Sequence, residues 1–280
     1  MVKASRNDID RFCELVLKHR SATNMFSAAS ALYGYADRGA LYITQQPSGV
    51  YMYADEGCFY SLLYVLTDMD APPDFADISV PVVIEIAYRG ETMPEAAKYL
   101  IKHGCKLMLT RARLRLDLIK ANSTEKTDEP DMSSNEQNGQ LAQNMQTGNN
   151  PKPSAEQVYE LFREAFDQYT GCVPSVQELT KALAEDRLIA IMSDGVLHGA
   201  LYHADSETAS TINNVAAASD VQGKGIGSRL VAEWISKCTA AGKRVLNLWV
   251  NIENAPAMRL YEKNGFKHDG MNSVVLKYER

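Results

Sequence analysis

Alternating glycines mark the segment of this chain best suited to binding chemistry. Residues 222–227 read Gln-Gly-Lys-Gly-Ile-Gly, between an apolar strand-like stretch at 212–218 and a helical pattern that begins at Ser228. Glycine allows a sharp turn and leaves backbone N–H groups open to a bound group. The first N–H groups of a helix have no partner inside the helix and lie at the positive end of its dipole. This corner is therefore predicted to bind a phosphate or diphosphate group.

Two well-known nucleotide-binding loops do not fit this segment. A P-loop has Lys followed by Ser or Thr after its last glycine, whereas Lys224 precedes Gly225. The dinucleotide fingerprint needs glycine where Ser228 stands, and an acidic residue about 20 positions later, where Lys243 and Arg244 occur. A tight strand-to-helix turn without any ligand is the other interpretation of these residues alone.

Regular elements are expected on the C-terminal side of the glycine loop. Apolar residues recur at helical spacing from Ser228 until Ala241-Gly242, which is a typical helix end. Asn254 and Pro256 are typical of a helix start. The expected elements are a helix at 228–240, a strand at 245–250, a helix from Pro256 to Asn264-Gly265 and a strand at 273–278.

Together these residues resemble the GNAT family of N-acetyltransferases. Residues 222–227 match that family's Q/R-x-x-G-x-G/A signature. Asn254 with residues 257–266 (Ala-Met-Arg-Leu-Tyr-Glu-Lys-Asn-Gly-Phe) resembles its second signature, N-x-x-A-x-x-x-Y-x-x-x-G-F. The two motifs stand in the family's order with a strand between them. The resemblance covers residues 154–280, and the first half of the chain contains neither signature.

The resemblance implies acetyl-CoA or another acyl-CoA as cosubstrate. Loop N–H groups would hold its pyrophosphate, and the open strand edge at 216–218 would pair with its pantetheine arm. Asn254 would hydrogen-bond that arm, although a helix cap explains the same residue and both roles can hold at once. The residues assigned to the cosubstrate are Ala217, Gln222, Gly223, Lys224, Gly225, Ile226, Gly227, Ser228 and Asn254.

Tyr261 is the expected catalytic residue. In the family match, its phenol would donate a proton to the departing CoA thiolate, a general-acid role worth ~100- to 10,000-fold in rate. A backbone N–H near Ala217 would stabilise the tetrahedral oxyanion. The alternative for Tyr261 is an aromatic side chain packed on the buried face of its helix.

No general base is assigned from the sequence. An amine acceptor must lose a proton before it attacks, and a water chain can serve as well as a side chain. His203, on an expected strand, is one candidate, although a lone strand histidine is more often structural. The ionisable residues near the expected site strands are His198, His203, Asp205, Glu207 and Glu253.

A polar stretch divides the chain. Residues 121–152 are rich in Asn, Gln, Ser, Thr and Asp and contain almost nothing apolar, so they are expected to form a flexible linker. The predicted domains are 1–120 and 153–280, in keeping with a length of 280 residues.

The order of patterns in the first half parallels that of the second half. The glycine loop and its helix are missing, because only the Pro-rich segment 69–79 joins the two central strands. We therefore expect a degenerate copy of the GNAT fold, or an unrelated α+β domain. The predicted fold is α/β (α+β), with a mixed, mostly antiparallel central sheet flanked by helices, twice in tandem. The first domain would cover an edge of the second, shape the acceptor pocket or form a homodimer.

Composition excludes several classes of protein. The net charge of −6 argues against nucleic acid as the main partner. The five cysteines form no C-x-x-C pair, which is typical of reduced cytoplasmic thiols, and no metal site is expected. The N-terminus shows no signal-peptide pattern, and no apolar run reaches the ~20 residues of a membrane span. We expect a cytoplasmic protein.

The predicted function is acyl-CoA-dependent N-acyl transfer to an amine of a small molecule, peptide or protein. The alternative is a non-catalytic acyl-CoA sensor or interaction protein. Tyr261 favours catalysis, because a sensor has no need of an acid for a leaving group. The acceptor would be bound by helices and a loop within 158–183, a region that does not identify it.

Overall fold

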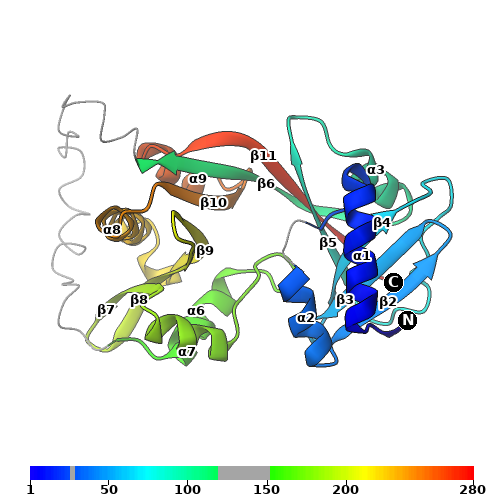
Figure 1. Ribbon diagram of the computed structural model, residues 1–280. Helices are drawn as coiled ribbons and strands as arrows, with labels where there is room; N and C mark the ends of the chain where they lie inside the picture. Colours follow the sequence, from blue (N-terminus) through cyan, green and yellow to red (C-terminus); the bar gives the residue numbers. More distant parts are fainter. Residues whose placement is uncertain (26–28, 119–151) are drawn as a thin grey trace. The chain divides into compact units, whose positions relative to one another are not determined.

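The computed structural model describes residues 1–25, 29–118 and 152–280, which form two compact units (Figure 1). Unit 1 comprises residues 1–112 and 270–280, and unit 2 comprises residues 113–269. The predicted linker at 121–152 lies, except for Lys152, outside the described residues.

Unit 1 is a sheet with helices on both faces. Its strands follow the order β1-β2-β3-β4-β5-β11-β6, and β4 and β5 run parallel. The helices α1 and α2 cover one face through Ile9, Phe12 and Leu32, and α3 packs on the other face, where Tyr51 and Tyr64 are buried. The elements are β1 (Val2–Lys3), α1 (Arg6–Lys18), η1 (Arg20–Ala22), α2 (Ala29–Asp37), β2 (Leu41–Gln46), β3 (Gly49–Asp55), β4 (Tyr60–Leu66), β5 (Val82–Arg89), α3 (Glu95–Lys102), and parts of β6 (Lys106–Asp117) and β11 (Lys267–Tyr278).

Unit 2 repeats this plan. Its strand order is β11-β6-β10-β9-β8-β7, and β9 and β10 run parallel. Its elements are the remaining parts of β6 and β11, together with α6 (Ala155–Ala165), α7 (Val176–Ala184), β7 (Leu188–Ser193), β8 (Val196–Asp205), β9 (Ala209–Ala217), η2 (Ser219–Val221), α8 (Ile226–Ala240), β10 (Val245–Asn251) and α9 (Ala255–Lys263).

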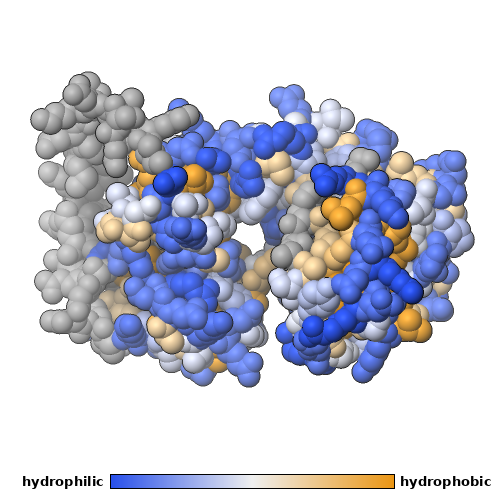
Figure 2. Space-filling model, in the orientation of Figure 1, coloured by the Kyte–Doolittle hydropathy of each residue, from blue (hydrophilic) through white to orange (hydrophobic). Residues whose placement is uncertain are grey.

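Local sequence explains where the first helices of each unit begin. Ser5, Ser154 and Ser175 each accept a hydrogen bond from the backbone N–H three residues later, and the side chain at that later position accepts from the serine N–H. These capping boxes satisfy N–H groups that a helix leaves unpaired at its start. The face seen in Figure 2 is largely hydrophilic with smaller hydrophobic areas, as expected where apolar residues turn inward. Within the described residues, no helix combines the length and apolarity needed to span a membrane.

Two strands depart from the predicted domain division. Residues 271–278 of β11 pair antiparallel with β5, so the end of the chain completes the sheet of unit 1. Conversely, Leu118 donates its N–H to the carbonyl of Arg244 at 2.9 Å, within unit 2. The division by contacts therefore differs from 1–120 and 153–280 at these two segments. Alternation of apolar residues identifies a strand and its buried face, but it does not identify the neighbouring strand.

As expected, no helix joins the two central parallel strands of unit 1. Residues 67–81 join β4 to β5 and contain no helix, whereas η2 and α8 join β9 to β10 in unit 2. Phe75 and Ile78 of this segment instead contribute to the core beside Tyr51 and Leu100. Both units are therefore versions of one arrangement, and only unit 2 retains the helix after its glycine loop.

Candidate functional site

The glycine loop requires glycine for its backbone conformation. Gly223 and Gly225 have φ angles of 77° and 85°, in the left-handed region that other residues rarely adopt. A Cβ atom built on either residue would meet no protein atom within 4 Å. The loop therefore faces open space, and its glycines leave that space clear.

Several N–H groups point from this corner without an acceptor in the described part of the chain. They belong to Gly223, Gly225, Ile226, Gly227 and Ser228. Gly225 is the N-cap of α8 and provides no side-chain cap, and the first turn of the helix contains no acidic residue. The positive end of the helix dipole is thus uncompensated, an arrangement suited to an anion.

One expected donor is already used within the turn. The N–H of Lys224 donates to the carbonyl of Val221 at 3.2 Å. The side-chain amide of Gln222 contacts the carbonyl of Ala217 at 3.4 Å, which connects the loop to the end of β9. The backbone N–H of Lys224 is therefore not free for a diphosphate. The side chain of Gln222 bonds to the end of β9 instead.

The strand that leads into the loop separates from its neighbour. β9 pairs with β10 only over residues 209–212, although both strands continue. Asn213 is an extra residue in β9, since Ile212 and Asn214 oppose consecutive residues of β8. Such a bulge bends a strand and increases its twist. It therefore opens a wedge between β9 and β10 that ends at the glycine loop.

Ala217 directs its N–H into this wedge. The next residue, Ala218, donates its N–H to the carbonyl of His198 on β8 at 2.9 Å. Successive N–H groups of a strand point in opposite directions, so that of Ala217 points away from β8. This is the position expected for the oxyanion donor.

A glycine that the sequence analysis did not identify allows the loop and strand to meet. A Cβ on Gly199 of β8 would lie 2.6 Å from Cγ2 of Ile226, the first residue of α8, and 3.0 Å from the carbonyl oxygen of Ala216. Gly199 thus lets α8 begin directly against the sheet. An isolated glycine inside a strand pattern signals such close approach, and the signal was present at this residue.

Tyr261 lies on α9 with its side chain only 5% exposed. A Cβ on Gly227 would lie 3.5 Å from Leu260, so α9 packs beside the start of α8. The phenol oxygen of Tyr261 has no hydrogen-bond partner among the described residues. This oxygen is not completely buried. Burial raises the pKa of Tyr261 above its usual value, which keeps the phenol protonated near neutral pH.

Asn254 caps α9. Its Oδ1 accepts a hydrogen bond from the N–H of Ala257 at 3.1 Å, and the residue is exposed. The interpretation of Asn254 as a helix cap is confirmed. The contact of its amide with a cosubstrate stays a prediction.

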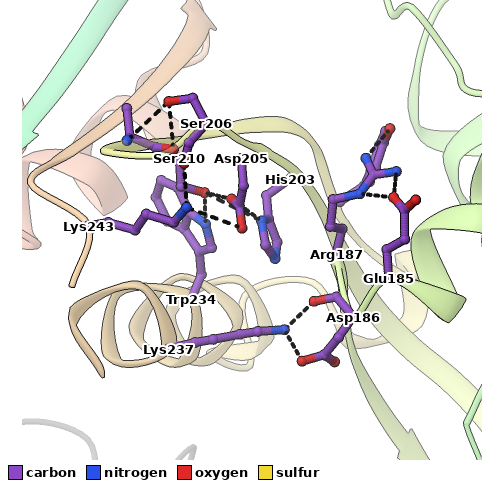
Figure 3. A network of polar contacts seen from close by, with 12 residues as sticks. Glu185, Asp186, Arg187, His203, Asp205, Ser206, Ser210, Trp234, Lys237 and Lys243 are labelled. Atoms are coloured by element: carbon purple, nitrogen blue, oxygen red, sulfur yellow. Dashed lines mark hydrogen bonds and ion pairs between the residues drawn. The ribbon is translucent and has the colours of Figure 1, made fainter. Parts of the chain in front are cut away.

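The base candidate His203 is confined to a buried polar network (Figure 3). Its ring is 1% exposed, and Nδ1 lies 2.9 Å from Oδ1 of Asp205. Ser210 donates to the same carboxylate oxygen at 2.6 Å and accepts the indole N–H of Trp234 at 3.0 Å. Burial lowers the pKa of His203, and the hydrogen bond with Asp205 only partly opposes that effect.

This network lies far from the wedge along the strand. His203 opposes Ile212, five residues before Ala217, a span of about 16 Å at the usual strand rise. Glu207 lies farther still, between β8 and β9. Of the ionisable candidates, His198 and Glu253 remain near the wedge end of the sheet: His198 opposite Ala218, and Glu253 directly before Asn254.

The described part of the chain contains no cluster of potential metal ligands. No group of three or more His, Cys, Asp or Glu side chains is placed there to share an ion. The five cysteines, all within the described ranges, form no disulfide, and burial raises the pKa of the Cys105 thiol to about 12.

Comparisons with known proteins agree with this geometry. Residues 155–266 match the model of the acetyltransferase (GNAT) family. An uncharacterised N-acetyltransferase of Methanocaldococcus jannaschii is 38% identical over 48 residues, which span 17% of this chain and 21% of that protein. The chain therefore matches about a fifth of the length of this curated relative.

Solved structures share the fold over both units. A GCN5-related N-acetyltransferase from Sphaerobacter thermophilus superposes with a TM-score of 0.54 and 15% identity, over 99% of this chain and 94% of its own. A tandem GNAT protein from the clavulanic acid biosynthesis pathway gives a TM-score of 0.56 with 11% identity, over 100% and 97%. At these identities the likeness concerns the fold, and it extends to a protein with two GNAT domains. Residues 155–266 of the chain are therefore similar to the GNAT family of acetyltransferases, and this segment contains both of the family's motifs.

Proposed function

We propose that this protein is an acyl-CoA-dependent N-acyltransferase that uses acetyl-CoA or another acyl-CoA. The acceptor is an amine of a small molecule, peptide or protein. The observation that carries the proposal is the row of N–H groups at residues 223 and 225–228, unpaired within the described chain, at the mouth of the wedge between β9 and β10. That combination suits a ligand with a diphosphate at one end and a polar, amide-containing arm at the other.

The reaction needs few protein groups. The amine nitrogen attacks the thioester carbonyl, and the N–H of Ala217 stabilises the oxyanion that forms. As the C–S bond breaks, Tyr261 donates a hydrogen bond and then its proton to the CoA sulfur. The acceptor's proton leaves to water, or to His198 or Glu253. The unpaired phenol of Tyr261 supports this role, because no residue of the described chain competes for its proton.

One observation favours a second candidate, a non-catalytic acyl-CoA sensor. A histidine next to a carboxylate can act as a general base. His203 and Asp205 form such a pair, but they lie far along the strand from Ala217. A sensor would bind acyl-CoA at the loop and release no CoA thiol with any amine.

The experiment that separates the two is a measurement of CoA thiol release from acetyl-CoA with a panel of amines, amino acids and peptides. An N-acyltransferase releases thiol in proportion to acylated amine, identified by mass spectrometry. A sensor binds acetyl-CoA with no release above the rate without protein. Absence of binding would contradict both functions.

A further inference from the structure

Unit 1 contains a wedge of the same kind as unit 2. Its parallel strands β4 and β5 pair only at Tyr60 with Val82 and at Ser61 with Val83, although both strands continue. Beyond those pairs, the facing N–H and C=O groups of the two strands need other partners. In unit 2 the corresponding groups lie where the arm of acyl-CoA is proposed to bind.

In unit 1 a single asparagine side chain bridges the two strands. Nδ2 of Asn24 donates to the carbonyl of Leu62 on β4 at 2.8 Å and to that of Glu85 on β5 at 3.1 Å. Its Oδ1 accepts the N–H of Tyr64 at 2.8 Å. Asn24 is only 8% exposed, so the primary amide is enclosed between the strands and its donors and acceptor are satisfied there.

The neighbouring threonine fixes this segment in place. Thr23 donates its hydroxyl to the carbonyl of Tyr64 at 2.7 Å and forms a backbone bridge with Val65. The two residues therefore occupy the inner edge of β4 over several positions. An amide of the chain itself makes the contacts that a strand edge would otherwise offer to an amide-containing ligand.

The diphosphate end of this wedge is also unsuited to a ligand. Residues 67–81 contain no glycine and no helix, so they present no cluster of unpaired N–H groups of the kind found at 223–228. The same segment contains four aspartates, Asp68, Asp70, Asp74 and Asp77. Negative charge at this end opposes a diphosphate.

We propose that Asn24 takes the place of the cosubstrate arm in unit 1, so that the chain binds one acyl-CoA and binds it in unit 2. The role of unit 2 in this statement rests on the proposed function, whereas the closure of unit 1 does not. Asn24 is a positioning residue: it bonds to β4 and β5 where these two strands do not pair with each other.

The first test is hydrogen exchange of the Tyr64 amide in the full-length protein. Asn24→Ala removes its acceptor, and Asn24→Asp retains an acceptor but places carboxylate oxygens against two carbonyls. We expect the Tyr64 amide to exchange at least tenfold faster in Asn24→Ala. Asn7→Ala, at an exposed asparagine of α1, should leave it unchanged. An unchanged rate in Asn24→Ala would show that Asn24 does not hold the wedge.

The second test measures where and how much acetyl-CoA binds. Equilibrium dialysis should give one acetyl-CoA per wild-type chain and none for Gly225→Glu. Added acetyl-CoA should protect amides of 223–228 and leave residues 60–66 and 82–89 unaffected. Two molecules per chain, or protection of 60–66 that persists in Gly225→Glu, would overturn the proposal. If the wild type binds none while Tyr64 responds to Asn24→Ala, the proposed function fails and the closure of unit 1 stands.

Discussion

The ring of Tyr261 packs edge-on against Phe266, with ring centroids 5.9 Å apart and planes at 68°. Phe266 in turn stacks on Trp234 at 6.1 Å with the planes only 10° apart. Trp234 is anchored by its hydrogen bond to Ser210, in the network around His203. The proposed acid is therefore held by a buried series of contacts that crosses from α9 to β9. Ser210 and Trp234 of the network in Figure 3 are thus connected to Tyr261 through Phe266.

The phenol of Tyr261 is expected to act in the chemical step alone. Tyr261→Phe should lower acyl transfer at least ~tenfold, toward the ~100-fold typical of a lost general acid, and leave the Kd for CoA within about twofold. The fold should tolerate the change, because the phenol oxygen has no partner in the described chain. Steady-state kinetics and calorimetric CoA titration measure both effects. Tyr88→Phe in unit 1 is the control, and equal turnover in Tyr261→Phe would remove the acid role.

The loop glycines allow a matched comparison. Gly225→Ala forces a side chain into a left-handed conformation at a cost of about 1–2 kcal/mol. Gly195 between β7 and β8 has a similar φ of 79° and equally open space, so Gly195→Ala carries the same strain away from the site. Both variants should lose similar stability in urea. Only Gly225→Ala should weaken CoA binding, and Gly225→Glu should abolish it. Equal CoA affinity in Gly225→Ala and Gly195→Ala would indicate that the loop is only a turn.

Stability should fall in mild acid because of His203. Its folded-state pKa is lowered by burial, so the unfolded chain takes up the proton first, at about pH 6.5. Stability is then lost as pH falls from about 6.5 toward the lower folded-state pKa. Burial of Asp205 is outweighed by hydrogen bonds from Ser210 and His203, so its pKa stays below the usual value and it remains ionised in this range.

Urea unfolding between pH 7.5 and 5 measures this loss. His203→Gln should show a smaller decrease over the interval than the wild type, whatever its stability at pH 7.5. The same substitution at the half-buried His19 is the control and should retain the wild-type decrease. A wild-type slope in His203→Gln would assign the acid sensitivity to other groups.

Because residues 271–278 of β11 pair with β5, a substitution at the end of the chain is expected to destabilise unit 1. Leu276 on β11 is 0% exposed and packs in the core of unit 1. Leu276→Ala should cost about 2–5 kcal/mol and accelerate amide exchange in β5, its pairing partner. Leu248→Ala on β10, 1% exposed, should instead accelerate exchange in β9. Faster exchange in β9 alone for Leu276→Ala would contradict the assignment of residues 270–280 to unit 1.

The sequence predicted those features of the candidate site that depend on local backbone geometry. Glycines at positive φ, a helix start at Pro256 and an apolar strand before the loop each leave a signal within a few residues. Tyr261 was predicted because residues 254–266 resemble the second GNAT signature, which contains a tyrosine four residues before Gly265. The missing helix of unit 1 was equally evident, because residues 67–81 contain two adjacent prolines and no glycine.

Long-range partners left no such signal. Asn24 bridges strands whose residues lie about 40 and 60 positions away in the chain, and a lone asparagine in a loop pattern predicts none of these contacts. The neighbours of β6 and β11 in the sheet are also not encoded, because alternation of apolar residues does not identify a pairing partner. His203 was considered as a base because of its expected strand, but its burial and its contact with Asp205 left no signal in the sequence.

A crystal structure of the full-length protein with acetyl-CoA tests the central claim most directly. We predict one bound molecule, with diphosphate oxygens within hydrogen-bond distance of the N–H groups of residues 225–228 and the thioester sulfur next to the phenol of Tyr261. Acetyl-CoA bound elsewhere, or a loop that stays empty at saturating concentration, would contradict the account.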